Sequence, residues 1–236
     1  MRMKRAAIIG LSVALTIVPT FAFAAGSKDY TSSSTSSTTT QNNNLGTGSA
    51  GTSEPTKGTA VHVEASGTII TTTGSTNDKS GTVISLVVDT KTTEGKAVVS
   101  NEEGGVEIGT LDVHFADGIA ETAGLPMDVV AKIDKLNQGK PVSEVLGSMI
   151  STDLSRYEKV GNTRAVIVYD SVTELTKTAT ELILHVDVEM GTEMAAVYYD
   201  NNTGRWVYVP VTVDPANNIV KLMVPGSCTL QLLKRV

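Results

Sequence analysis

Short alternating apolar runs, separated by clusters of turn-forming residues, fill residues 198–233 of the chain. Residues 197–199 precede the cluster 200–204, whose Asp, Asn and Gly residues tolerate positive φ or bond their own backbone, and residues 205–209 follow it. This order predicts a β-hairpin. Since successive side chains of a strand point to opposite faces, runs of this kind form sheets rather than helices.

The same pattern continues to the end of the chain. Residues 211–213 and 219–224 flank a turn that contains Pro215, and Pro225–Gly226 precede a last predicted strand at 228–234. Further strands are predicted at 61–63, 68–73, 82–89, 96–100, 105–115, 164–169, 180–189 and 194–199. Their short connections favour antiparallel pairing, because parallel neighbours need a long crossover.

One stretch, residues 126–137, has the period of a helix. Val129, Ile133 and Leu136 recur on one face, and residues 141–146 read as a second, shorter helix. We expect these two helices to form a connector packed on sheet edges. A partner-binding helix is the alternative interpretation.

The N-terminus has the pattern of an export signal. A basic start, an apolar run that Pro19 ends and small residues at 22–24 predict a signal peptide over residues 1–24, cleaved after Ala24 or Ala25. A membrane anchor is the alternative, but the run is shorter than the ~20 residues that span a bilayer. Residues 25–59 are rich in Ser, Thr and Asn and predict a disordered linker.

The predicted fold class is therefore mainly β, with antiparallel β-sandwich-like lobes and a short two-helix connector. We expect an N-terminal antiparallel lobe over residues 60–122, the connector over 125–150 and a C-terminal sandwich-like lobe over 151–236. The sequence leaves open whether the two β regions share one core.

Charge and targeting limit the expected partners. The formal net charge is −6, and removal of Arg2, Lys4 and Arg5 with the leader makes the body more acidic. An acidic body without a basic cluster disfavours nucleic acid and anionic lipid, which attract clustered Lys and Arg. We therefore expect a secreted or surface-associated protein that contacts no membrane after leader cleavage.

No catalytic or metal-binding spacing is recognisable. His62, His114 and His185 lie far apart in the sequence, so no zinc site and no other cofactor is predicted. Cys228 alternates with Leu230 and Leu232 and is interpreted as a buried apolar residue rather than a nucleophile.

An aromatic cluster is the one candidate for ligand contact. Trp206, Tyr208 and Tyr198 lie near one another in the predicted hairpin, and an aromatic face of this kind stacks on sugar rings. Packing of Trp206 against the core is the alternative interpretation. The oxygen-rich residues 200–204 are interpreted as the hairpin turn, not as a calcium loop, because the chain enters a strand at once.

A resemblance rests on the helix with residues 137–141 (Asn-Gln-Gly-Lys-Pro), on the motif at 199–206 (Tyr-Asp-Asn-Asn-Thr-Gly-Arg-Trp), and on Asp214-Pro215 and Pro225-Gly226-Ser227. In this order of motifs the chain resembles a loosely defined group of secreted proteins from Gram-positive, clostridia-like bacteria. Its C-terminal segment is similar to β-sandwich modules of bacterial surface proteins. The resemblance covers roughly residues 105–234 and implies no catalytic residues.

The sequence thus favours a secreted, non-catalytic β module that binds a cell-wall component, a glycan or a secreted protein. Two alternatives stay open. One is a secreted hydrolase whose acidic residues gather only in the fold, and the other is a structural spacer in a surface layer, which would self-associate.

Overall fold

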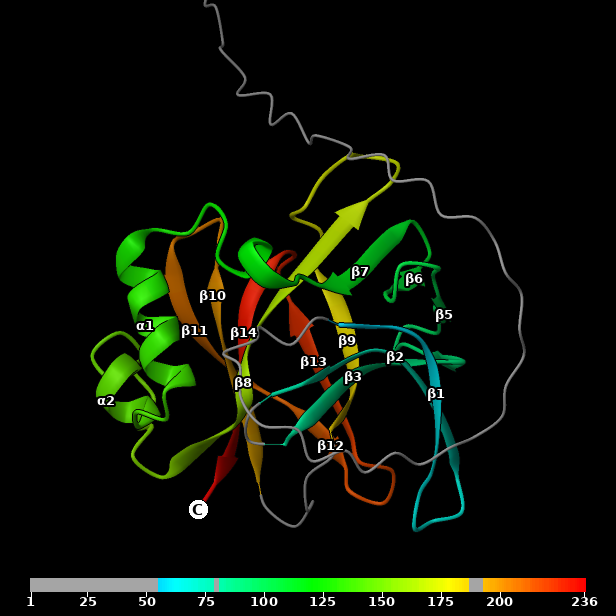
Figure 1. Ribbon diagram of the computed structural model, residues 1–236, viewed down its shortest axis with the longest axis horizontal. Helices are drawn as coiled ribbons and strands as arrows, with labels where there is room; N and C mark the ends of the chain where they lie inside the picture. The colour runs from blue at the N-terminus through cyan, green and yellow to red at the C-terminus, as the bar shows by residue number, and fades with distance from the viewer. Residues whose placement is uncertain (1–54, 79–80, 187–192) are drawn as a thin grey trace, which may run out of the picture. The chain divides into compact units, whose positions relative to one another are not determined.

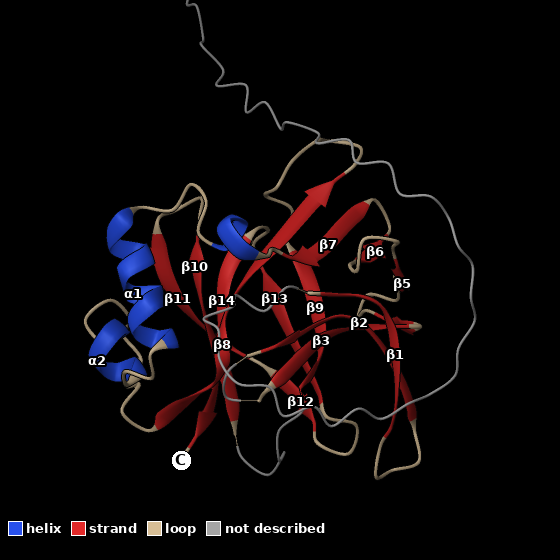
Figure 2. Cartoon of the chain, viewed as in Figure 1, coloured by secondary structure: helices blue, strands red, loops and turns tan. Residues whose placement is uncertain are grey.

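Two antiparallel sheets form the body of the protein (Figures 1 and 2). The computed structural model describes residues 55–236, except 79–80 and 187–192. The predicted signal peptide and most of the predicted linker lie outside these residues. The last residues of that expected linker are in fact part of the first strand, which starts at Thr56.

The six-stranded sheet has the order β1-β2-β3-β9-β13-β12. Its strands are β1 (Thr56–Val63), β2 (Ile69–Asn77), β3 (Val83–Val88), β9 (Thr180–Val186), β13 (Ile219–Val224) and β12 (Thr212–Asp214). The eight-stranded sheet has the order β11-β10-β14-β8-β7-β6-β5-β4. Its strands are β11 (Arg205–Pro210), β10 (Met194–Asp200), β14 (Cys228–Arg235), β8 (Tyr157–Asp170), β7 (Leu111–Phe115), β6 (Val106–Ile108), β5 (Ala97–Ser100) and β4 (Thr90–Lys91).

The main hydrophobic core lies between the sheets. Leu86 and Leu184 from one sheet meet Val113, Val166 and Leu230 from the other, and each of these side chains is at most 2% exposed. The alternation read from the sequence therefore sets the inner faces of a sandwich, and the prediction of a mainly β, antiparallel fold is confirmed.

The strands do not divide into the two lobes expected from the sequence. In the six-stranded sheet β3 pairs with β9, and in the eight-stranded sheet β7 pairs with β8. Each sheet thus combines strands from residues 60–122 and from residues 151–236. The difference arises because alternation along a strand fixes its faces but does not specify its neighbour.

Residues 105–115, read as one strand, form the hairpin of β6 and β7. Val106 pairs with Val113, and Gly109 adopts a positive φ of 67° at the turn. The alternation of apolar residues continues through this turn, so the sequence pattern does not indicate that the chain reverses its direction there. The predicted placement of Asp112 and His114 on the face opposite Val113 is confirmed, since these two side chains are partly exposed.

Two helices form a third layer on the outer face of the eight-stranded sheet. They are α1 (Met127–Asn137) and α2 (Val142–Leu146), and a short 3-10 turn, η1 (Gly118–Glu121), precedes them. The predicted stripe of α1 is buried against β10, β11 and β14. The helices therefore pack on a sheet face and not on the sheet edges predicted from the sequence (Figure 2).

Gly74 in β2 provides a test of how closely the two sheets approach. Its φ is +61°, and a β-carbon there would collide with the carbonyl oxygen of Gly104, in the turn between β5 and β6. Gly109 is a matched control, because it has a similar φ of +67° and open space around it. Gly109→Ala should cost about 1 kcal/mol of unfolding free energy from the left-handed backbone alone.

We expect Gly74→Ala to cost about 3 kcal/mol or more, because the carbonyl must also move. Urea denaturation of both variants measures the difference. Equal losses of unfolding free energy for the two variants would show that β2 and the turn between β5 and β6 are not in close contact at Gly74.

Candidate functional site

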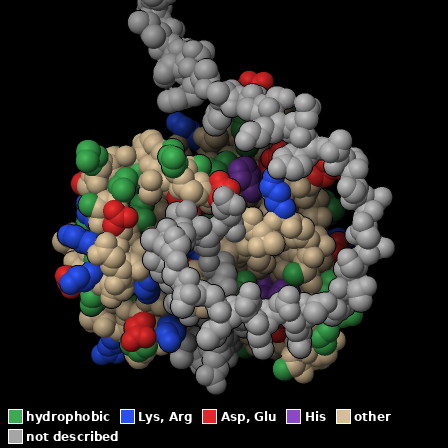
Figure 3. Space-filling model, in the orientation of Figure 1, with side chains coloured by type: hydrophobic (Ala, Val, Ile, Leu, Met, Phe, Trp, Pro, Cys, Tyr) green, Lys and Arg blue, Asp and Glu red, His purple; other side chains and the backbone are tan. Residues whose placement is uncertain are grey.

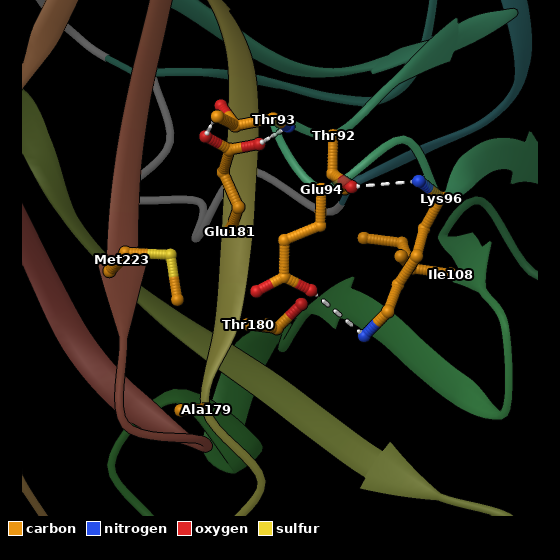
Figure 4. Close-up of a pocket in the computed structure, with 9 residues that line it drawn as sticks. All are labelled: Thr92, Thr93, Glu94, Lys96, Ile108, Ala179, Thr180, Glu181 and Met223. Atoms are coloured by element: carbon orange, nitrogen blue, oxygen red, sulfur yellow. Dashed lines mark hydrogen bonds and ion pairs between the residues drawn. The ribbon is translucent and has the colours of Figure 1, made fainter.

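A pocket of about 250 Å³ lies at one end of the sandwich (Figure 4). The six-stranded sheet contributes residues from β9 and β13, and the eight-stranded sheet contributes β6 and the turn between β4 and β5. Its lining consists of Thr92, Thr93, Glu94, Lys96, Ile108, Ala179, Thr180, Glu181 and Met223. Ligand pockets usually measure ~300–1,000 Å³, so this pocket suits a small group rather than a large ligand.

The turn between β4 and β5 forms one wall of the pocket. The backbone N–H of Gly95 donates to the carbonyl of Thr92 at 2.8 Å, and that of Thr92 donates to the carbonyl of Lys96 at 2.9 Å. The Thr92 hydroxyl accepts the backbone N–H of Lys96 at 3.1 Å. A positive φ of 84° at Gly95 closes the turn, which is therefore preorganised by local bonds.

Glu181 ties this turn to the opposite sheet. The backbone N–H and the hydroxyl of Thr93 both donate to its carboxylate, one to each oxygen, at 2.6 Å. Glu181 belongs to β9 of the six-stranded sheet, so the two bonds join the layers across the end of the sandwich. Hydrogen bonds to an ionised carboxylate are stronger than neutral ones.

The remaining walls combine polar and apolar side chains. Glu94 and Lys96 form an ion pair of 3.3 Å, with 70% and 54% of their side chains exposed. A pair this exposed contributes little to stability and exchanges readily with other partners. Ile108 and Met223 supply apolar surface, and Figure 4 shows the Glu94 carboxylate directed into the space between them.

The aromatic residues predicted to contact a ligand do not form one platform. Trp206 is 6% exposed and packs beneath the helices against Tyr199, with ring centroids 5.5 Å apart. Tyr208 lies on the same sheet face, whereas Tyr198 points to the opposite face and packs on the core between the sheets. The alternative interpretation, in which Trp206 belongs to the core, describes the structure.

Tyr208 has a polar partner under the helical layer. Its hydroxyl lies 3.1 Å from that of Tyr157, and this hydrogen bond together with burial raises the pKa of Tyr208 to about 12. Burial also raises the pKa of Tyr198, with Asp200 and Cys228 adding to the effect. Both phenols therefore act as neutral hydrogen-bonding groups near neutral pH.

The carboxylate of Asp200 serves the hairpin turn. It accepts the backbone N–H of Asn202 and the hydroxyl of Thr203, each at 2.8 Å, and the N–H of Gly204 donates to the Asp200 carbonyl. The interpretation of residues 200–204 as a turn is confirmed. Over the described ranges, no group of three or more His, Cys, Asp or Glu side chains is arranged to hold a metal ion.

The histidines are distributed in a way that the sequence did not indicate. His114 pairs with Asp112 at 3.1 Å on β7, but the rings of His62 and His185 stack with their centroids 4.4 Å apart. Residues from β1 and β9 meet only because of the sheet arrangement. The same is true of Thr93 and Glu181, which lie 88 residues apart, so no local spacing would have revealed either pair.

Comparison with protein-family models, with curated proteins and with solved structures finds no match for this chain. The resemblance to secreted proteins of clostridia-like bacteria therefore rests on the motifs quoted above. No helix in the described part of the chain is both long and apolar enough to cross a bilayer.

The tie between Thr93 and Glu181 can be tested by Glu181→Ala. Loss of both bonds should free the turn between β4 and β5, so amide exchange at residues 92–96 should accelerate at least about fivefold, equivalent to about 1 kcal/mol. Hydrogen exchange read by NMR or mass spectrometry measures this. The control is Glu94→Ala in the same turn, which loses only an exposed ion pair and should change exchange by no more than about twofold.

Cys228 should be unreactive in the native protein. It is 1% exposed, and burial together with Asp200 raises its thiol pKa to about 12, so the reactive thiolate is scarce near neutral pH. We expect a thiol reagent at about pH 8 to label the native chain at least ~100-fold more slowly than the chain in denaturant. Ser151→Cys places a control thiol at an exposed position, and labelling of Cys228 at the rate of that thiol would contradict the burial.

Proposed function

We propose that this chain is an exported, non-catalytic β-sandwich module that binds a glycan of a cell surface through the pocket at the end of the sandwich. The signal-peptide pattern of residues 1–24 and the Ser-, Thr- and Asn-rich sequence between it and the start of β1 at Thr56 support export. The observation that carries the binding role is the pocket itself, which the two sheets build together and which the bonds between Thr93 and Glu181 hold in shape.

The chemistry of the walls favours a single hydroxylated ring. Sugar hydroxyls need both donors and acceptors, which Lys96, Glu94 and the threonine hydroxyls supply, while Ile108 and Met223 offer surface for the C–H groups of a ring. The exposed ion pair between Glu94 and Lys96 is able to reorganise around a hydroxyl at small cost.

The distribution of surface charge is consistent with a neutral partner. Over the described residues of the face in Figure 3, Lys and Arg side chains are interspersed with acidic and hydrophobic ones, without a large patch of one sign. A nucleic-acid partner would be favoured by a continuous basic surface instead. A neutral glycan requires no such surface.

Titration of the full mature chain with a trimer of N-acetylglucosamine and with a trimer of glucose tests this role. We expect NMR shift changes at residues 92–96, 179–181 and 223 with at least one sugar. Glu94→Ala and Lys96→Ala should each weaken binding at least about threefold, because each removes a charged hydrogen-bonding partner. Glu103→Ala and Lys140→Ala remove charges outside the pocket and serve as controls.

Three results would count against the proposal. Absence of binding to both sugars, or shift changes outside the pocket, would remove the assigned site. Shortened sugars in the same solution would favour the alternative of a secreted hydrolase. Concentration-dependent self-association without sugar binding would favour a structural spacer.

A further inference from the structure

The strands β1 and β2 form a hairpin that bends over the outer face of the six-stranded sheet (Figure 1). Leu184 and Val186 point into the core between the sheets, so His185, which lies between them on β9, points outward. His62 of β1 reaches His185 although β2 and β3 separate the two strands in the sheet order. The two imidazole rings stack with centroids 4.4 Å apart and planes inclined by 27°.

Polar groups hold the tip of this hairpin in place. Glu64 lies 2.8 Å from His185 Nε2 through one carboxylate oxygen and accepts the side-chain amide of Asn218 at 2.9 Å through the other. Ser66 donates to Asn217 at 2.7 Å. The side chains of His185 and Glu64 are only 4% and 7% exposed, so this contact is shielded from water.

Apolar packing fixes only part of the hairpin tip. Ile70 of β2 is 7% exposed and belongs to the main core, whereas Val61, Val63 and Ile69 are between 65% and 75% exposed. The docked position of the hairpin tip therefore depends in large part on the polar contacts of His62, His185 and Glu64. Histidine is the side chain whose charge ordinarily changes between about pH 5 and pH 8.

Additional protons act against this arrangement. His185 Nδ1 is buried and has no hydrogen-bond partner, whereas Nε2 faces the Glu64 carboxylate. A proton on Nδ1 would be a buried donor without an acceptor, although the Glu64 carboxylate would partly compensate its charge. A proton on His62 as well would place two cations face to face in the stack.

Two further charged residues lie near the stack on elements that the structure describes. Lys221 of β13 is paired with Ile183 and lies on the same face as His185, where it adds positive charge. Asp214 lies near the hairpin tip, in the segment that leads to Asn217, and its carboxylate already accepts the Asn217 amide at 2.7 Å. The hydroxyl of Thr72 on β2 lies 3.1 Å from His62 Nε2, and Ser85 on β3 pairs with His185; neither hydroxyl titrates in this range.

We propose that His62, His185 and Glu64 form a proton-operated latch that docks the β1–β2 hairpin near neutral pH and releases it on acidification. Release would expose the buried Nδ1 of His185 and the stacked ring of His62 to water, where an added proton is solvated. Docking therefore weakens as the pH falls, by up to about tenfold per pH unit for each extra proton. The inference concerns the hairpin and is independent of the pocket at the end of the sandwich.

Amide hydrogen exchange of the full mature chain tests the latch. Between about pH 7.5 and about pH 5, after correction for intrinsic exchange rates, protection at residues 59–73 should fall at least ~10-fold. Protection in β14, within the eight-stranded sheet, should change less than ~3-fold, which separates hairpin release from global unfolding.

Three variants locate the effect. His62→Phe keeps an aromatic ring in the stack but cannot take up a proton, so the loss of protection should shrink below ~3-fold. Glu64→Gln removes the carboxylate and should leave the hairpin poorly protected already near neutral pH. His114→Phe, at the histidine on β7, is the control and should behave as the original chain.

The proposal is overturned if protection at residues 59–73 does not depend on pH, or if β14 loses protection in parallel. It is also overturned if His62→Phe and His114→Phe respond to acid equally. Should His62→Phe fail to fold, Glu64→Gln decides the question, since full protection of its hairpin at neutral pH contradicts the role of the carboxylate.

Discussion

Burial of β10 and β14 on both of their faces is the constraint from which the arrangement of layers follows. Along β10, Met194 and Ala196 face the six-stranded sheet, while Ala195 and Val197 face the helices. A strand that is apolar on both sides must be covered twice. The six-stranded sheet supplies one cover, and α1 with α2 supplies the other, so the helices are a structural layer and not merely a connection between two lobes.

The sequence predicted most elements, because each strand or helix carries its own periodicity. The stripe of Val129, Ile133 and Leu136 and the turn at residues 200–204 are local signals, and both are found as expected. Pairing is not local: nothing along the chain specifies that β3 lies beside β9 or that β7 lies beside β8. The tie between Thr93 and Glu181, and hence the pocket, depends on that long-range pairing. The residue types of Trp206 and Tyr208 favour a ligand site, but their packing under the helices depends on tertiary contacts that no local pattern specifies.

Contacts between the two sheets include a buried charge. Arg164 of β8 is 5% exposed, and its Nε donates to the hydroxyl of Thr76 on β2 at 2.6 Å. Burial lowers the pKa of this guanidinium, whereas Asp78 and Glu121 raise it. Burial also raises the pKa of Glu121. A buried charge contributes little net stability, but it is costly in any pairing that leaves it without these partners. Arg164 therefore favours one alignment of the sheets over others that would bury the same apolar area.

An irregularity in β8 connects all three layers at one place. Opposite Gln231, β8 carries extra residues, because Leu230 pairs with Arg164 and Leu232 pairs with Val160. Side chains bond the backbone groups that this bulge leaves unpaired. The Gln231 side-chain amide donates to the carbonyls of Val160 and Gly161. The backbone N–H of Asn162 donates to the Asp78 carboxylate at 2.5 Å. Asn137, at the end of α1, accepts the N–H of Thr163 at 2.9 Å. A one-residue slip of β14 against β8 would remove these partners together and turn the apolar side chains of β14 to the wrong faces, so the bulge fixes the register on which both the core and the helical layer depend.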